Sequence, residues 1–179
     1  MSDNHDNHED HHDHHNPGFI QKYIFSTDHK TIGLQYGLTA MLFLLFGFYL
    51  MMVMRWSIAY PNEPLPAWMS WLFTEDWKAQ WLTEGKLPGE TYNMFGAMHG
   101  TIMVFLGIVP LGFGAFGNYV TPLQIGAPDM AFPKLNMVSY YLYVIGGVMM
   151  CASFFMESGA AKSGWTNYPP LSFFADAQY

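Results

Sequence analysis

Residues 91–128 read TYNMFGAMHGTIMVFLGIVPLGFGAFGNYVTPLQIGAP, and this stretch contains no Asp, Glu, Lys or Arg. Two further stretches, 31–54 and 135–156, also lack all four charged residue types. A helix needs about 20 apolar residues, at about 1.5 Å each, to span the hydrocarbon core of a bilayer. The middle stretch fits one long helix, because Pro110 and the glycine-rich run after it leave no room for two. The sequence therefore predicts an all-α, polytopic membrane helix bundle with transmembrane helices at about 30–55, 92–118 and 134–156.

The overall composition supports this prediction and excludes several other classes of protein. Apolar residues make up 51% and charged residues 12%, whereas soluble proteins carry about 25% charged residues. Three uncharged runs in one short chain argue against the alternative of buried helices in a large soluble protein. Aromatic residues at 18% exclude a disordered chain, and Cys151 as the only cysteine excludes a disulfide scaffold. A net charge of −7 argues against nucleic acid as a partner.

Two polar segments bring the mean hydropathy down to +0.08. Residues 1–16 hold six His and five acidic residues without Lys or Arg, which is typical of a disordered, exposed tail with weak metal binding as the alternative. The connection 56–91 holds five Trp, which concentrate at membrane interfaces, and we expect a short interfacial helix around 66–83. The Lys and Arg residues divide three against four between the two sides, so the positive-inside rule does not orient the bundle.

His99 is an ionisable residue within the longest uncharged run, and such residues are costly inside a membrane. Gly96 and Gly100 flank it, so a bulky group could approach the helix closely. An imidazole nitrogen is a common ligand of haem iron. The alternative is a helix-packing site in which His99 forms a hydrogen bond to a neighbouring helix. The residues alone leave both interpretations open.

Four motifs stand in order along the chain: FSTDHKTIG at 25–33, YNMFGAMHGTIMVF at 92–105, GNYVTPLQIGAPDMAFPKLN at 117–136 and GWTNYPPL at 164–171. Together they resemble subunit I of the haem-copper terminal oxidases. The resemblance covers about residues 17–172 and implies a subunit of twelve transmembrane helices, of which this chain supplies three.

The resemblance implies a role for three residues at haem groups. His99 matches an axial ligand of the low-spin haem, which we expect to be haem A. Arg55 matches an arginine at the periphery of that haem, although on the sequence alone it could be an arginine that extends to the interface. Trp165 matches a tryptophan that donates to a propionate of the high-spin haem, which suits an indole N–H.

Asp129 matches the carboxylate at the mouth of the family's proton-uptake channel, and Asn118 and Asn136 match the asparagines that line its entrance. A carboxylate at an aqueous mouth collects protons, and amides order the water behind it. The alternative is that Asp129 caps the third helix at its positive end, and both roles are compatible.

The resemblance also bears on the electron donor. The quinol-oxidising branch of the family typically carries an Asp, a His and a Gln where this chain has Ala59, Thr91 and Met94. None of these three can replace the set that hydrogen-bonds a quinone, so we expect cytochrome c as the donor, with quinol as the alternative.

The catalytic centre is not complete in this chain, because the family's ligands for copper and for the high-spin haem lie on later helices. We expect a truncated, split or partly represented subunit, with residues 173–179 as an interrupted connection. The expected partners are the remainder of subunit I, the copper-bearing subunit II, subunit III and membrane lipid, and the resemblance leaves open a respiratory supercomplex. The expected location is the bacterial cytoplasmic membrane with the N-terminus in the cytoplasm. A different class, a small membrane protein that binds metal through its His-rich tail, would not need these motifs.

Overall fold

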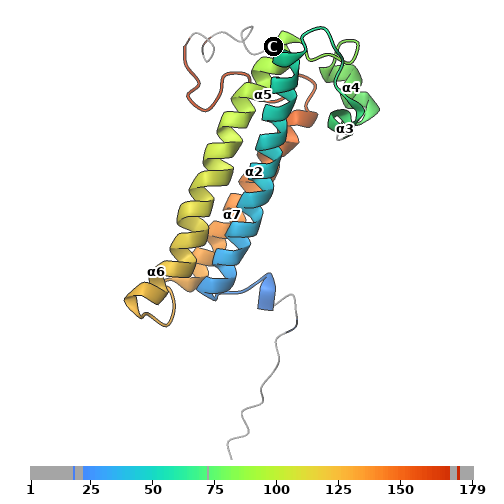
Figure 1. Cartoon of the computed structure of the whole chain (residues 1–179). Coiled ribbons are helices and arrows are strands. Elements are labelled where there is room, and N and C mark those ends of the chain that lie inside the picture. The colour runs from blue at the N-terminus through green and yellow to red at the C-terminus, as the bar shows by residue number, and fades with distance from the viewer. Residues whose placement is uncertain (1–17, 19–21, 72, 170–172, 174–179) are drawn as a thin grey trace, which may run out of the picture.

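The computed structural model describes residue 18 and residues 22–71, 73–169 and 173. The predicted tail at 1–16 and all of the predicted connection 173–179 except Phe173 lie outside these residues. Three long helices run side by side along one axis (Figure 1). Apart from an isolated bridge between Thr83 and Lys86, the described part of the chain contains no β-structure. The prediction of an all-α bundle is therefore confirmed.

Three helical stretches among the described residues are long and apolar enough to cross a membrane: His29–Ala59, Gly89–Ile125 and Pro133–Phe155. The first is α2 (His29–Ala59). The third is α7 (Pro133–Ala152) followed by the short 3-10 segment η3 (Ser153–Phe155). Only 28%, 28% and 11% of their most apolar windows are buried, so each span keeps a wide apolar face uncovered.

The second span is built from four consecutive segments. The α-helix α5 (Gly89–Thr101) continues into two π-helical segments, η1 (Ile102–Ile108) and η2 (Pro110–Gly117), and then into α6 (Asn118–Ile125). Gly126 ends it in a left-handed conformation at φ 70°, which glycine adopts without steric cost. The predicted end near residue 118 was wrong, because the prolines and glycines widen and extend this helix without breaking it.

Pro110 lies inside the second span and has no N–H, so the helix lacks one backbone hydrogen bond at this point. The hydroxyl of Tyr143 on α7 donates to the nearby carbonyl oxygen of Leu106 at 2.7 Å. A backbone carbonyl inside a bilayer needs such a partner, because no water is present to provide one. Tyr143 therefore satisfies a backbone carbonyl close to Pro110 and links α7 to the second span.

Pro122 also has no N–H, so the carbonyl of Asn118, four residues earlier in α6, receives no hydrogen bond from it. Here the compensating group comes from α2, since Nδ1 of His29 lies 2.9 Å from the Asn118 carbonyl oxygen. His29 is 1% exposed, so this hydrogen bond is protected from water. Close to each proline of the second span, a backbone carbonyl thus accepts from a side chain of a different neighbouring helix.

The connection between the first two spans folds into two short helices, α3 (Ala67–Ser70) and α4 (Glu75–Trp81), where one helix at 66–83 was predicted. Thr74 interrupts them, because its side chain caps α4 by accepting from the Trp77 N–H. These helices project to one side at the end of the bundle opposite α6 (Figure 1). We call this end the Trp-rich end.

The largest hydrophobic core lies at the Trp-rich end, where the connection packs against the first two spans. Phe73 stacks on Phe95 with an interplanar angle of 2°, and Phe95 meets Phe154 edge to face. Met94 is 0% exposed and lies in the same cluster. Aromatic side chains of this size dominate the burial of apolar area, so this core fixes how the connection sits on the spans.

Candidate functional site

His99 lies near the end of α5, and its ring is held by α2. Its Nδ1 atom is 2.8 Å from the carbonyl oxygen of Gly47. A carbonyl oxygen only accepts, so Nδ1 carries the proton and donates. The neutral imidazole then keeps its lone pair on Nε2, the nitrogen that is free for a metal. A ligating histidine usually has its other ring nitrogen fixed in this way.

The surroundings of His99 fit a large, flat, apolar group. A Cβ added at Gly100 would meet nothing within 4 Å, so the helix surface is open beside the ring. One to two turns further on, Phe105 and Ile108 are apolar side chains that are 45% and 60% exposed. The residues present therefore fit a haem, with the imidazole of His99 as the ligand for the iron.

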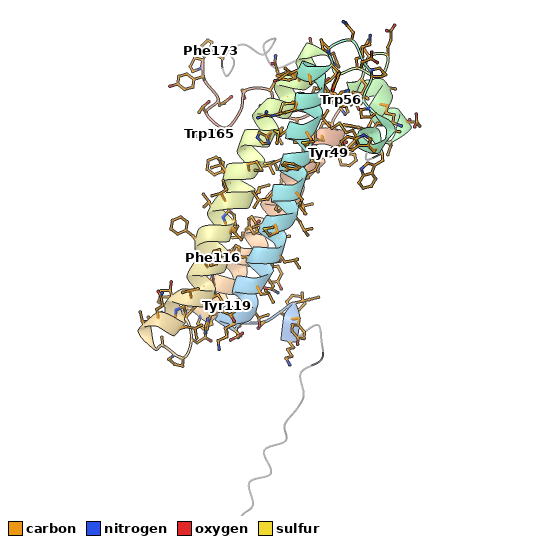
Figure 2. All side chains as sticks on the ribbon, viewed as in Figure 1. Tyr49, Trp56, Phe116, Tyr119, Trp165 and Phe173 are labelled. Atoms are coloured by element: carbon orange, nitrogen blue, oxygen red, sulfur yellow. The ribbon has the colours of Figure 1, made fainter. Side chains whose placement is uncertain are left out.

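Arg55 is exposed and lies one turn before the end of α2. It follows Gly47, the residue that orients His99, by eight positions, or about 12 Å of helix axis. Trp165 lies on the loop after α7, where it is 60% exposed and meets Phe105 edge to face at 5.6 Å (Figure 2). Arg55 thus lies toward the Trp-rich side of the His99 level, whereas Trp165 contacts the second span six residues beyond His99.

Asn118 and Asn136 lie at the opposite end of the bundle, on α6 and α7. Asn118 is 6% exposed, and its Nδ2 donates to the Gly114 carbonyl at 2.6 Å. Its Oδ1 atom and the Nδ2 atom of Asn136 are buried without a hydrogen-bond partner among the described residues. Leaving a buried acceptor or donor unpaired costs about 1–3 kcal/mol each, and the surroundings of both atoms would have to shift before water could reach them.

Asp129 lies in the loop between α6 and α7 and is half-buried. Its Oδ1 accepts from the Met130 N–H at 2.7 Å. It does not cap the third span, because α7 begins at Pro133 and its cap position, Phe132, makes no side-chain capping bond. The capping alternative was therefore wrong. Among the described residues, no hydrogen bond joins Asp129 to either asparagine.

Three polar residues at this end were not singled out by the sequence reasoning. His29 bonds the Asn118 backbone as described above. Ser139 donates to the Asn136 carbonyl at 2.7 Å, and its hydroxyl is 3.1 Å from that of Tyr36 on α2. These contacts link three helices through polar side chains. Ser139 and Tyr36 give only a weak signal in the sequence, because Ser and Tyr are common in apolar spans. His29 could have been noticed, because it is an ionisable residue at the start of a span.

The positions that would carry a quinone-binding set are not gathered at one open surface. Thr91 is 4% exposed and Met94 is 0% exposed. The backbone N–H of Ala160 contacts the Met94 sulfur at 3.1 Å, so the loop after α7 covers this face of α5. Ala59 is exposed at the end of α2. Further chain packed around the bundle can only bury Thr91 and Met94 more deeply.

The described residues contain no group of three or more His, Cys, Asp or Glu able to hold a metal ion. The His-rich stretch 1–16 lies outside them. Unlike a cluster site, one imidazole such as that of His99 suits an iron that is already held by a macrocycle.

Fold and site together define a polytopic helical membrane protein that presents a free imidazole nitrogen inside one span. The chain belongs to the family described as "Cytochrome C and Quinol oxidase polypeptide I", whose model matches residues 31–179. It is 41% identical over 150 residues to "Cytochrome c oxidase subunit 1" of Thermostichus vulcanus and to the protein of the same description from Synechocystis sp.. It is 40% identical over 154 residues to "Heme-copper oxidase subunit I+III" of Aeropyrum pernix.

These alignments cover most of this chain but a small part of each relative. They include 84%, 84% and 86% of the chain, and 23%, 23% and 16% of the respective relatives. The chain thus spans about a quarter or less of the length of the curated relatives it matches. The prediction that it resembles part of an oxidase subunit I is confirmed.

Proposed function

We propose that this chain forms part of the catalytic subunit of a respiratory cytochrome c oxidase. The complex reduces O2 to water and pumps protons across a bacterial cytoplasmic membrane. Family membership and the relatives described as cytochrome c oxidase subunit 1 support this proposal. The single observation that carries it is the His99 ring, whose Nδ1 bond to Gly47 leaves Nε2 for iron.

In this proposal His99 holds the iron of a low-spin haem A. The bound haem supplies one-electron transfer. The chain's own contribution is to fix the tautomer and orientation of the imidazole through the Gly47 carbonyl, and to exclude water with the apolar side chains of η1. Arg55 would neutralise or hydrogen-bond polar groups at the edge of that haem. Trp165 would donate its indole N–H to a propionate of the high-spin haem.

Proton uptake is proposed at the end of the bundle opposite the Trp-rich end. Asp129, half-buried in the loop, would receive protons from the aqueous side. The unpaired Oδ1 of Asn118 and Nδ2 of Asn136 would order water behind it, because each has unused hydrogen-bonding capacity. The hydroxyls of Ser139 and Tyr36 would extend this path toward the middle of the bundle.

Cytochrome c is the proposed electron donor, and quinol is the alternative. Burial of Thr91 and Met94 supports cytochrome c, because a quinone head group needs an accessible set of hydrogen-bonding side chains. Oxygen consumption by the assembled complex, driven by added cytochrome c or by added quinol, distinguishes the two donors. Faster consumption with quinol would assign the chain to the other branch.

The proposed partners are the remainder of subunit I, a copper-bearing subunit II, a subunit III and cytochrome c. The uncovered apolar faces of all three spans support packing against further helices or lipid. The copper and the high-spin haem belong to the rest of the subunit, since the described residues offer no further ligand cluster. In the proposed orientation, the Trp-rich end faces outward and the N-terminus lies in the cytoplasm.

The test of the haem assignment is the His99→Ala variant of the assembled oxidase, read by its reduced-minus-oxidised spectrum. We expect loss of the low-spin haem signal. His29→Ala is the matched control, because it removes a buried imidazole that bonds a carbonyl at the other end of the bundle. An intact low-spin signal in His99→Ala would overturn the assignment.

A further inference from the structure

An apolar groove of about 390 Å³ lies at the Trp-rich end, between α2, the first turn of α4 and the end of the third span. Three elements that are far apart in the sequence form its walls. The lining residues are Phe46, Thr74, Trp77, Cys151, Phe154 and Phe155. We call this feature the α4 groove. It shares no lining residue with the surroundings of His99 or with the asparagines at the opposite end, and none of the roles proposed above uses it.

The floor of the α4 groove is a well-packed aromatic surface. Phe154 is 4% exposed, and its ring meets those of Phe46 and Phe95 edge to face, with centroids 5.7 and 6.2 Å apart. Trp77 and Phe155 form a second aromatic pair, with centroids 4.5 Å apart. Because neighbouring rings hold each of these side chains, the groove keeps its shape without a ligand. A preformed site of this kind lowers the entropic cost of binding.

Water is a poor occupant of the α4 groove. Phe46 and Cys151 belong to stretches that are apolar enough to cross a membrane. Thr74 supplies the hydroxyl of the lining, and its oxygen already accepts from the Trp77 N–H at 3.4 Å. An ordered water needs about two to four polar partners, which these walls do not offer. An apolar group is therefore the favoured occupant, because it makes dispersion contacts with the walls.

The position of α4 decides which apolar group can enter. This helix projects away from the spans at the Trp-rich end, and Thr74 and Trp77 in its first turn form one side of the groove (Figure 1). A transmembrane helix is about 10–12 Å across and continues to the membrane surface. A further span laid along the groove would meet α4 on its way. An acyl chain is thinner and flexible, and its head group lies at the interface that the tryptophans of the connection indicate.

We propose that the α4 groove binds one acyl chain of a membrane phospholipid, packed against Phe46, Phe154 and Phe155. This inference goes beyond the proposed function and depends on the membrane location alone. Thr74 is exposed, and its hydroxyl can donate to an ester carbonyl of the lipid. Lipid tails in the bilayer are as apolar as the groove, so the preference for this site comes from van der Waals packing against its aromatic walls. The bound chain would hold α4 against the spans.

The experiment uses the assembled oxidase in vesicles that contain a phosphatidylethanolamine with a photoreactive diazirine in one acyl chain. After illumination, mass spectrometry of the peptides gives the labelled residues and the yield at each. Cys151→Phe fills the groove, and Ala152→Phe is its matched control at the next position, which is exposed and does not line the groove. The haem spectrum confirms that each variant is assembled.

A second pair of variants tests a wall of the groove at an exposed position, where folding is not at risk. Phe155→Ala removes a side chain that is 68% exposed and lines the groove. Ile145→Ala is its control, because Ile145 is 55% exposed on the same span and lies outside the lining.

We expect labelling at Phe46 and Trp77 that saturates at one lipid per complex. Cys151→Phe should lower this yield by about fivefold or more, and Phe155→Ala by about threefold, whereas both controls should leave it unchanged. Labelling that spares Phe46 and Trp77 would show that another protein segment covers the groove, and it would overturn the proposal. Labelling that does not saturate, or that is equal in the wild type and in all variants, would show contact with bulk lipid alone and would also overturn it.

Discussion

The two ends of this bundle are built on opposite principles. At the Trp-rich end, apolar and aromatic side chains such as Phe73, Phe95 and Met94 pack into a core that excludes water. At the other end, a smaller buried cluster around Ile32 and Ala115 lies beside buried polar residues, and Asn118 and Asn136 each keep an atom without a partner among the described residues. The first end is mainly an aromatic core, and the second combines a small apolar core with polar side chains.

This difference separates residues that stabilise the fold from residues proposed to take part in proton uptake. Burial of apolar area from water contributes about 25 cal/mol per Å², so substitutions in the aromatic core of the connection should lower stability. Unpaired buried amides cost stability unless water satisfies them. Substitutions at the two ends should therefore affect different measurements, and the predictions below test this from the largest expected effect on stability to the smallest.

Gly159→Ala should be the most damaging substitution at the Trp-rich end. Gly159 has a φ of 77°, and an added Cβ would lie 2.3 Å from a ring carbon of Trp81. Left-handed backbone costs about 1–2 kcal/mol for an L-residue, and overpacking adds about 1–3 kcal/mol. We expect a loss of about 3 kcal/mol, measured by thermal denaturation of the assembled complex.

Gly164→Ala is the matched control for that substitution. Gly164 has a similar φ of 71°, but an added Cβ would meet nothing within 4 Å. Only the backbone cost of about 1 kcal/mol remains. Equal losses for the two alanine variants would show that packing around Trp81 is not tight.

His29→Leu should lower the stability of the end of the bundle opposite the Trp-rich end by about 2 kcal/mol. The Asn118 carbonyl, to which Pro122 has no N–H to donate, would lose the His29 donor. His29→Gln keeps an amide donor and should recover part of the loss. Denaturation of the assembled complex measures both variants. Equal stability of the two variants would show that the hydrogen bond to the Asn118 carbonyl does not contribute to the free energy of unfolding.

Tyr143→Phe should cost about 1 kcal/mol, through loss of the hydroxyl that donates to the Leu106 carbonyl. Tyr141→Phe is the control on the same helix, since its hydroxyl donates to the exposed carbonyl of Ile24. The same denaturation assay should show almost no change for the control. A larger loss in the control would contradict the role given to Tyr143.

Asn136→Leu should leave stability nearly unchanged while slowing proton uptake. It removes a donor, Nδ2, that has no partner among the described residues, so no such hydrogen bond is lost. A water chain deprived of one hydrogen bond of about 1.4 kcal/mol would conduct about tenfold more slowly. Proton uptake by the oxidase in vesicles is the measurement, and an unchanged rate would remove Asn136 from the proposed path.

The sequence predicted the three spans because charge is absent over each of them, and charge is the strongest cost inside a bilayer. It placed His99 inside the membrane for the same reason. It did not predict that the second span continues to Ile125, because prolines and glycines ordinarily end a helix. The contacts of His29 and Tyr143 with backbone carbonyls come from residues far away in the chain, and no local pattern indicates them.

The geometry of the individual sites could not be predicted from the sequence, because it too depends on residues from other helices. The hydrogen bond to a neighbouring helix that the packing alternative at His99 expects is present, from Nδ1 to the Gly47 carbonyl on α2, and the same bond leaves Nε2 for a ligand. The supposed cap at Asp129 depended on where α7 begins, and the helix begins four residues later. Motif spacing alone cannot supply either fact.

The contact between Tyr143 and Leu106 has a consequence for biogenesis. Spans enter a membrane in chain order, so the second span is inserted before Tyr143 has been synthesised. Until the third span arrives, the Leu106 carbonyl lacks the hydroxyl that satisfies it. The third span therefore completes the second one, and a nascent chain halted between them would keep a carbonyl inside the bilayer without this donor.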